Sequence, residues 1–561
     1  MYYIIMILLF LKPSIKKKDR SEQIERAIVG FIFSWVLFYV VCVDKSIYFI
    51  MAALWVPAIF QMSLSLGSKD KNKSKFMGVM YILLFLSIGY NLYPFITAGA
   101  SKLASEVSVN ESSDGILKAD ANHIIVISPE TAYYEMQKMI GTLPNPSIYS
   151  IGELGVTMTK KGACYVAPIE VDGLFRALTN SEIPGSIYVS AQKPEEAKVI
   201  NVPSKVAKSL LFGKDLKRYL RQQKPSSILF QANVELDDEN NPYYVGSYGH
   251  YKIGRKFPVI DGVLLYSFKD AKVIDYSVDK VPKWVDEVYP SNVSELYNKY
   301  FGTYQKGLLN KIISKKGVHV PTAWEGQTEV HGLKVNSKEV TGVIDTDGKM
   351  KWFTDHTNTS ENSTTMTGYS MMDMRSGKII YYKTPGYING KGAMNAVDKA
   401  LGADKANWTP VQPLFYNIFG SEAFVVPVVN KNDGAIVKIA IVSAKNSYVV
   451  LEESKGAAIE SFKNAISYGK ISDGADKNAN SIKGKEKLTR GKVLRISPVA
   501  ESGNTVFYVK LVGNKTIFMV TKAAGIDIVL TKENDEVEIK YFDIKDNNVV
   551  STVSFKNNNI K

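Results

Sequence analysis

The side chains best suited to acid–base or metal chemistry are scattered along this chain of 561 residues. Its five histidines are isolated from one another, and neither an H-E-x-x-H motif nor a cysteine pair at zinc-binding spacing occurs. The sequence also contains no G-x-S-x-G motif, no P-loop and no dinucleotide-binding fingerprint. We therefore expect no catalytic residue, no metal ligand and no cofactor, and we predict that the protein is not an enzyme.

Three polar clusters come nearest to a ligand site. Residues 235–239 form an acidic run followed by Asn-Asn-Pro, a composition typical of a solvated hairpin turn. Asp345 and Asp347 beside a glycine resemble part of a calcium-binding loop that lacks its downstream ligands. Asp355–Thr357 lies near Trp352 and could line a site. We do not count any of the three among the predicted sites.

The best candidate for a binding surface lies near the C-terminus. Residues 490–561 contain a succession of short alternating apolar runs, which predicts a compact all-β unit. Two of these runs, GKVLRISPV and TVFYVKLVG, resemble strands of an OB-fold or a related small barrel. Such barrels bind oligonucleotides or sugars, or pack in oligomers. The candidate stacking and charged surface consists of Phe507, Tyr508, Lys510, Lys515 and Phe518. In the alternative interpretation, the aromatic residues belong to the core and the lysines to a solvated face.

The first hundred residues predict an anchor in a membrane. Three uncharged apolar runs occur there, at residues 28–43, 47–66 and 76–97. A helix needs about 20 apolar residues to cross about 30 Å of hydrocarbon, so we interpret the three runs as transmembrane helices. Residues 1–12 are also apolar but shorter, and no signal-peptide cleavage site follows them, which leaves open whether they span the membrane.

Basic residues predict the orientation of these helices. Lysines and arginines precede the first run and lie again between the second and third, whereas the loop at Asp44-Lys45 is nearly neutral. The positive-inside rule places both basic loops in the cytoplasm. Residues 101–561 are therefore predicted to lie outside the cytoplasmic membrane. Their single cysteine, Cys164, allows no internal disulfide, which favours a bacterial envelope or a phage protein made in a bacterium.

The part of the chain after residue 100 is mildly basic and rich in alternating apolar patterns. Residues 1–100 hold 11 Lys or Arg against five Asp or Glu, so membrane topology accounts for much of the formal charge of +14. Composition predicts a linker, an α+β domain, β-rich modules, a second linker and a small barrel, at residues 101–120, 121–230, 231–470, 471–489 and 490–561.

Hairpin patterns recur between residues 231 and 470. Turn residues separate alternating apolar runs in GVIDTDGKMKWFT, YSMMDMRSGKIIYYK and AFVVPVVNKNDGAIVKIAIV. Helical patterns, GAMNAVDKALG and SKGAAIESFKNAI, follow the last two. The last two hairpins with their helices, together with the earlier segment PYYVGSY...GVLLYSFKDAKVIDYS, resemble PepSY-like domains over roughly residues 230–470. Those domains are small extracytoplasmic modules in which an antiparallel sheet packs on a helix. The resemblance implies tandem modules of this kind.

The predicted fold class is thus α+β, with N-terminal transmembrane helices, tandem hairpin-and-helix modules and a small C-terminal β-barrel. A large ectodomain without a catalytic motif favours a membrane-anchored, non-catalytic binding or scaffold protein. Its expected partners are the lipid bilayer and a protein of the envelope. The first alternative is nucleic-acid binding at the membrane through the C-terminal barrel. A third hypothesis is an enzyme of an unfamiliar type.

Overall fold

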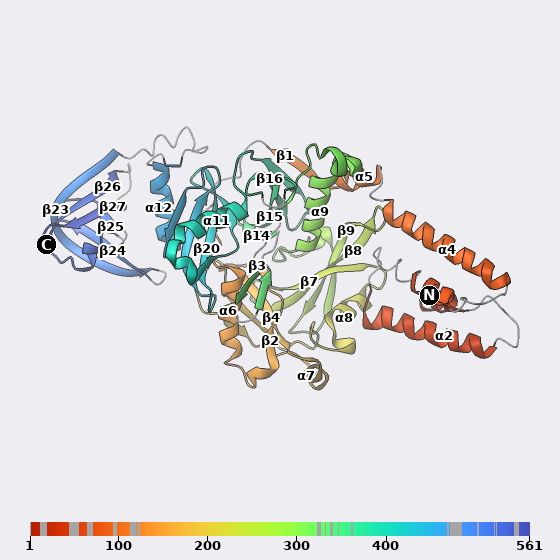
Figure 1. Ribbon diagram of the computed structural model, residues 1–561. Coiled ribbons are helices and arrows are strands. Elements are labelled where there is room, and N and C mark those ends of the chain that lie inside the picture. Colours follow the sequence, from red (N-terminus) through yellow and green to blue (C-terminus); the bar gives the residue numbers. More distant parts are fainter. Residues whose placement is uncertain are drawn as a thin grey trace.

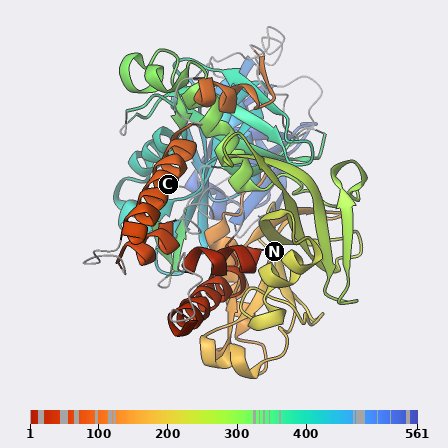
Figure 2. The same cartoon turned by 90° about the vertical axis from the view of Figure 1, so that its right-hand side faces the viewer.

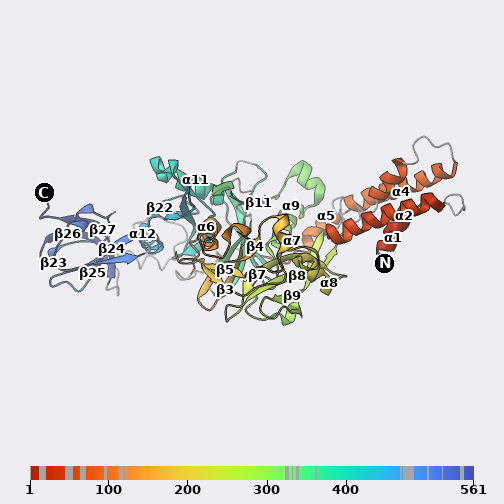
Figure 3. The ribbon, with the colours of Figure 1, turned by 90° about the horizontal axis from the view of Figure 1, so that it is seen from below.

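The computed structural model is an elongated molecule, with the N-terminal helices at one end and the C-terminal barrel at the other (Figures 1 and 3). The residues that it describes are 2–11, 20–43, 55–63, 71–93, 98–112, 119, 124–322, 327–330, 333–336, 340–345, 347–360, 363–467, 470–471, 485–501, 504–520, 522, 524–543 and 549–560.

The N-terminal end is a group of helices. Helix α1 (Tyr2–Phe10) packs on α2 (Arg20–Trp35), which continues as the π-helix η2 (Val36–Val40). Residues 55–63 are helical, and α4 (Lys71–Leu92) follows. Within the described residues, one helix, Arg20–Val40, is long and apolar enough to cross a membrane, and the apolar part of α4, Met80–Leu92, is shorter.

The expectation of three transmembrane helices is therefore wrong for the described residues. The predicted run at 76–97 falls largely in α4, which begins among lysines. The apolar part of α4, Met80–Leu92, is too short to count as a membrane span. The predicted run at 47–66 lies largely outside the described residues, as does most of the linker predicted at 471–489.

The next part of the chain forms a five-stranded sheet with helices beside it. Its strand order is β2-β4-β5-β6, and β3 pairs with β4. The strands are β2 (Tyr149–Ile151), β3 (Gly155–Thr159), β4 (Gly162–Val171), β5 (Ser186–Ser190) and β6 (Lys198–Ile200). The helices are α6 (Pro129–Ile140), α7 (Leu174–Thr179) and α8 (Leu216–Gln223).

Three further sheets follow, and each contains three consecutive antiparallel strands after which a helix comes in the sequence. The first set is β8 (Pro242–Lys252), β9 (Phe257–Ser267), β10 (Val273–Ser277) and α9 (Ser291–Tyr304), with β7 (Ile228–Leu236) added at the edge. The second set is β15 (Met350–Thr357), β16 (Met366–Asp373), β17 (Ile379–Lys383) and α11 (Gly390–Leu401). The third set is β20 (Ser421–Asn430), β21 (Ile436–Ser443), β22 (Val449–Glu452) and α12 (Lys455–Ser467).

Strands from elsewhere in the chain complete these sheets. The sheet of β15, β16 and β17 also contains β1 (Val109–Ser112), β11 (Val320–Pro321) and β14 (Thr341–Ile344). The sheet of β20, β21 and β22 also contains β18 (Trp408–Pro410) and β19 (Leu414–Ile418). Strand β1 follows helix α5 (Ala98–Ser105) and pairs in parallel with β17. A separate pair is β12 (Gln327–Val330) and β13 (Leu333–Asn336). One hydrophobic core cluster extends from Ala100 to Ile471 and joins all three sheets to the first.

One turn geometry recurs in these sheets. Between β16 and β17, the Gly377 N–H donates to Asp373 O at 2.9 Å and the Asp373 N–H donates to Lys378 O at 2.9 Å. The fifth residue of the turn needs a positive φ, which Gly377 adopts at 70°. The same two backbone hydrogen bonds close the turns at 267–271, 430–434 and 443–447.

The C-terminal strands close into a barrel of order β23-β24-β25-β27-β26. They are β23 (Lys485–Glu501), β24 (Asn504–Leu511), β25 (Ile517–Val520), β26 (Glu536–Asp543) and β27 (Val549–Asn557). The long β23 pairs with β24 along one part and with β26 along the other, which closes the sheet, while β25 and β27 run parallel. The barrel has a hydrophobic cluster of its own.

The predicted fold class as a whole is contradicted. The described N-terminus has one helix that fits a membrane span, and the hairpins do not form separate tandem modules. The reason is that strands distant in sequence, such as β1 and β14, complete the sheets, and one continuous core joins them.

The part of the chain after α4 contacts the end of the N-terminal helices through α8. Arg218 donates from Nε to Tyr39 O at 2.5 Å and from a guanidinium nitrogen to Val40 O at 2.9 Å. Arg221 donates to Val43 O at 2.5 Å. Cationic side chains thus cap the carbonyl end of η2, which is the favourable end for positive charge. Figure 2 shows the molecule from this side, with the helices toward the viewer.

Candidate functional site

A cavity of about 330 Å³ lies where helix α6, the sheet of β2 to β6, strand β7 and the sheet that contains β14 and β15 meet. This volume is at the lower end of the range for small-molecule sites. Its walls are mainly apolar, and its polar groups come from segments far apart in the sequence. The lining residues are Pro129, Tyr133, Gly152, Glu153, Leu154, Gly155, Val156, Tyr165, Asn233, Glu287, Ser291, Val340, Thr341, Gly342, Trp352, Gln412 and Leu414.

Two polar atoms of the lining side chains have no hydrogen-bond partner among the described residues. They are Oγ1 of Thr341, at the start of β14, and Nε2 of Gln412, in the loop between β18 and β19. Both residues are buried. A buried polar group without a partner costs about 1–3 kcal/mol, so a ligand that hydrogen-bonds to these two atoms would recover that free energy.

The backbone at Gln412 is strained. Its φ is 26°, in a region that L-amino acids seldom adopt. The preceding residue, Val411, donates its N–H to Pro427 O at 2.9 Å, which ties this loop to β20. Strained residues held by their surroundings cluster at ligand sites. The strain at Gln412 thus coincides with its unpaired amide at the cavity.

A buried carboxylate–amide pair supplies a further polar group of the cavity. Asn233 on β7 donates from Nδ2 to both carboxylate oxygens of Glu287, at 2.9 Å each. The backbone N–H of Ser291, at the start of α9, donates to the same carboxylate at 3.4 Å. The cavity therefore offers a carboxylate acceptor, a hydroxyl and an amide donor between apolar walls.

Two further buried acids lie next to this pair. Glu235 accepts hydrogen bonds from the backbone N–H groups of Asp286, at 2.7 Å, and Glu287, at 3.0 Å. Asp286 accepts from the Met158 N–H at 2.6 Å and from the Thr157 hydroxyl at 3.1 Å. Burial raises the pKa of Asp286 to about 6. Burial and then the charge of Asp286 raise the pKa of Glu235 well above its ordinary value.

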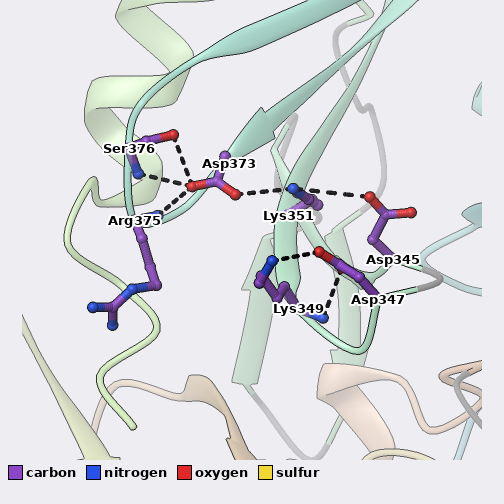
Figure 4. Close-up of polar contacts among 7 residues, drawn as sticks. All are labelled: Asp345, Asp347, Lys349, Lys351, Asp373, Arg375 and Ser376. Carbon is purple, nitrogen blue, oxygen red and sulfur yellow. Dashed lines mark hydrogen bonds and ion pairs between the residues drawn. The ribbon is translucent and has the colours of Figure 1, made fainter. Parts of the chain in front are cut away.

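The turn between β16 and β17, drawn in Figure 4, carries Arg375, which contacts the segment before Asp286 and Glu287. Asp373 accepts hydrogen bonds from the backbone N–H of Ser376 at 2.8 Å and from its hydroxyl at 2.9 Å. The Arg375 side chain points away from the carboxylates of Asp373, Asp345 and Asp347 (Figure 4). Its guanidinium donates to the backbone carbonyls of Val281, at 3.0 Å, Pro282, at 2.9 Å, and Val285. Arg375 is therefore a positioning residue for the acidic segment.

The acids that resembled part of a calcium loop are paired with lysines (Figure 4). Lys351 lies 2.9 Å from the Asp373 carboxylate and 3.8 Å from that of Asp345. Lys349 lies 2.7 Å from Asp347. Burial alone would raise the pKa of Asp373, but the hydrogen bonds from Lys351 and from the turn lower it to about 2. These contacts make a structural network, and each of the three carboxylates has a cation as its neighbour.

The acidic run at 235–239 is less solvated than its composition predicts. Glu235 and Asp237 are buried. Asp237 accepts from the backbone N–H groups of Glu239, at 2.9 Å, and Asn241, at 2.7 Å, so its carboxylate closes the turn. The segment is a hairpin turn, as expected, but its first residue belongs to the acid cluster beside the cavity.

His319 and His356, distant in sequence, form a buried pair. Their Nδ1 atoms lie 2.9 Å apart, and Nε2 of His356 lies 3.0 Å from Oδ1 of Asn298. Because that oxygen only accepts, Nε2 of His356 carries a proton and its Nδ1 accepts one from His319. Burial lowers the pKa of His319 to about 4 and that of His356 well below its ordinary value. The pair is a neutral core network, whereas the nearby Trp352 lines the cavity.

The five residues predicted as a binding surface on the barrel are divided between its core and its surface. Phe518 is fully buried, with its ring 5.0 Å from that of Tyr541, so it is not free to stack on a ligand. Phe507 packs partly against the same core, and Tyr508 is half-buried. Lys510 donates to the backbone carbonyl of Lys515, at 2.5 Å, and Lys515 is exposed. Nucleic-acid binding by the barrel stays a prediction.

Sequence reasoning missed the cavity because its polar residues come from separate segments. Thr341 and Gln412 stand in runs without any motif. One signal was present: the segment VPKWVDEVYP places Asp286 and Glu287 between apolar residues, and charged residues in such a context are often buried and paired.

No family model and no curated protein matches the chain. Two solved structures are similar to parts of it. A putative exo-beta-1,3-galactanase from Bifidobacterium bifidum s17 is 9% identical, with 55% of this chain and 72% of that chain covered and a TM-score of 0.18. An exo-beta-1,3-galactanase from Clostridium thermocellum is 10% identical, with 72% of this chain and 76% of that chain covered and a TM-score of 0.20. TM-scores this low carry no argument about fold or chemistry, and the resemblances to PepSY-like domains and to the OB-fold stay predictions.

Both matched structures are of enzymes, which stands against the prediction that this protein is not one. That prediction depended on the lack of a known catalytic motif, and such motifs cover only some enzyme families.

Proposed function

We propose that this chain is a membrane-anchored binding protein whose extracytoplasmic part holds a small amide-bearing ligand in the cavity beside Glu287. The observation that carries this proposal is the pair of buried, unpartnered polar atoms, Thr341 Oγ1 and Gln412 Nε2, at one apolar cavity. A binding site needs a few convergent polar groups within apolar walls, and this cavity has them.

The chemistry of the lining selects the ligand class. The Gln412 amide donates a hydrogen bond and needs an acceptor such as a carbonyl oxygen. The Glu287 carboxylate accepts and therefore favours an N–H group, while the Thr341 hydroxyl can do either. An amide group presents both a carbonyl and an N–H, and the apolar walls suit a hydrocarbon substituent. A capped amino acid or a short peptide end fits these requirements.

The exposed apolar helices support the membrane anchor. On α2, Ile28 and Phe31 are 52% and 54% exposed, and on α4 Phe85 is 76% exposed. Apolar surface of this extent is unfavourable in water and favourable in lipid. Lysines precede the Arg20–Val40 helix and an arginine begins it, which favours a cytoplasmic location for its N-terminal end. The Val40 end, which contacts α8, and the ectodomain then lie outside the cytoplasm, where an envelope protein is the expected partner.

The test is thermal unfolding of the full chain in lipid nanodiscs with a panel of N-acetylated amino-acid amides that carry apolar side chains. A ligand at 100 times its Kd stabilises the folded state by about 2.7 kcal/mol, which raises Tm. We expect at least one panel member to raise Tm, and we expect the double variant Thr341→Val, Gln412→Leu to lose this response.

The matched control is Thr179→Val with Gln222→Leu, which makes the same chemical changes at exposed positions. It should respond to the ligand as the native chain does. A panel without effect on Tm, or a cavity variant that still responds, would contradict the proposed ligand class.

A further inference from the structure

Three exposed apolar side chains protrude from the segment that follows α9. This segment comprises α10 (Gly307–Leu309) and the π-helix η7 (Asn310–Ser314), and we call residues 306–316 the tip. Leu309, Ile312 and Ile313 are 63%, 62% and 76% exposed. Their spacing of three and four residues places them on one side of the helical segment.

The tip is also strongly basic. It contains four lysines, at positions 306, 311, 315 and 316, and no acidic residue. Lys311 lies over the ring of Tyr304 at 5.2 Å, and Lys306, Lys315 and Lys316 are exposed. Apolar side chains flanked by lysines are typical of helices that lie in the interface of an anionic bilayer.

The tip lies on the same end of the ectodomain as the N-terminal helices. Helix α10 packs on α5, which begins at Ala98, six residues after the end of α4 at Leu92. Figure 1 shows α5 and the segment after α9 beside the end of α4, and Figure 2 shows this segment on the face from which the helices project. A membrane that surrounds the N-terminal helices would therefore lie close to the tip.

We propose that the tip inserts Leu309, Ile312 and Ile313 into the interface of an anionic lipid bilayer, with its lysines at the headgroups. This inference rests on the proposed membrane anchoring. Lipid fits better than a protein partner, because the tip combines only three apolar side chains with an unbroken positive charge and lies where the chain leaves the anchor. The contact would hold the ectodomain at a fixed tilt to the membrane.

The test places the environment-sensitive dye NBD on Ile313→Cys in the full chain, reconstituted in nanodiscs of phosphatidylcholine with or without phosphatidylglycerol. The native Cys42 and Cys164 are buried, which keeps the label at the engineered site. The matched control is Leu530→Cys. Leu530 is an apolar residue that is 66% exposed, and it belongs to the barrel, which lies at the far end of the molecule. We expect a blue-shifted emission at 313 that doxyl-labelled lipid quenches, and water-like emission at 530.

Phosphatidylglycerol should increase the blue shift. The triple variant Lys306→Gln, Lys315→Gln, Lys316→Gln should reduce the blue shift at least twofold. A chain that does not co-elute with nanodiscs would overturn the anchor and the inference together. A chain that co-elutes, with emission at 313 as water-like as at 530, would overturn the inference alone. A blue shift that doxyl lipid does not quench would show contact with protein instead, and would also overturn it.

Discussion

At the scale of single residues, buried carboxyl, amide and hydroxyl groups give the candidate site its polar character. Glu287 is held by Asn233 and by the start of α9, so its carboxylate is fixed before any ligand arrives. Thr341 Oγ1 and Gln412 Nε2 have no such partner among the described residues. This contrast separates groups that shape the cavity from groups that remain available to a ligand.

The first prediction concerns Thr341. Valine has the same shape as threonine but no hydroxyl, so Thr341→Val removes a buried, unpartnered polar atom. We expect the variant without ligand to be more stable by about 1 kcal/mol, measured by chemical denaturation. The matched control is Thr357→Val, because the Thr357 hydroxyl donates to Thr365 O at 2.8 Å and its loss should destabilise. Equal effects of the two substitutions would contradict this view of Thr341.

The second prediction concerns Asp286 and pH. Burial raises its pKa from 3.8 to about 6, so the folded state binds the proton more tightly than the unfolded state does. The resulting stability is fully present below about pH 4 and is lost as pH rises through about 6. The difference between a pKa of 3.8 and one of about 6 corresponds to about 3 kcal/mol.

Asp286→Asn should abolish this pH-dependent contribution to stability, while it keeps an oxygen for the Met158 N–H. We therefore expect the free energy of unfolding of the variant, relative to the native chain, to rise by up to about 3 kcal/mol between pH 4 and pH 7. Denaturation of both proteins across this range measures the difference. A difference that does not change with pH would show that Asp286 titrates normally.

At the scale of elements, the recurrent hairpin turn links the sequence to the site. The pairings of β14 with β15, β16 with β17 and β20 with β21 confirm the three hairpins that the turn residues predict. Local patterns fix such hairpins because the turn and both strands are contiguous. The cavity was not predictable in this way, since β3, β7, β14 and the loop before β19 meet only through tertiary packing.

The third prediction concerns Gly377 in the turn that presents Arg375. A Cβ at this position would lie 2.5 Å from the ring of Tyr289, and φ is 70°. Gly377→Ala should therefore add a clash to the backbone strain, which by itself costs about 1–3 kcal/mol. The matched control is Gly402→Ala, where φ is 57° and a Cβ meets nothing within 4 Å.

We expect Gly377→Ala to lower Tm more than Gly402→Ala does, and to weaken ligand binding, because Tyr289 follows Glu287 closely in the chain. The same thermal unfolding assay measures both effects. Equal changes in Tm would show that Tyr289 moves aside without cost.

At the scale of the whole molecule, three bodies lie in sequence from the N-terminal helices to the barrel (Figure 3). One core cluster from Ala100 to Ile471 unites the central sheets, whereas the barrel has its own. The arginines of α8 join the central body to the end of η2. Because the central body adjoins that end, the orientation of the Arg20–Val40 helix would decide on which side of the membrane the cavity lies under the proposed anchoring.

The fourth prediction tests this orientation. Glu195→Cys places a thiol at an exposed site of the central body, and Ser21→Cys places one at the exposed start of α2. Background labelling should be low, because Cys42 and Cys164 are buried and burial raises the pKa of Cys164 to about 12, which keeps it protonated. In intact spheroplasts, a membrane-impermeant maleimide should label residue 195, and residue 21 only after permeabilisation, since the positive-inside rule holds the basic end in the cytoplasm. The reverse pattern would place the cavity in the cytoplasm and contradict the extracytoplasmic location.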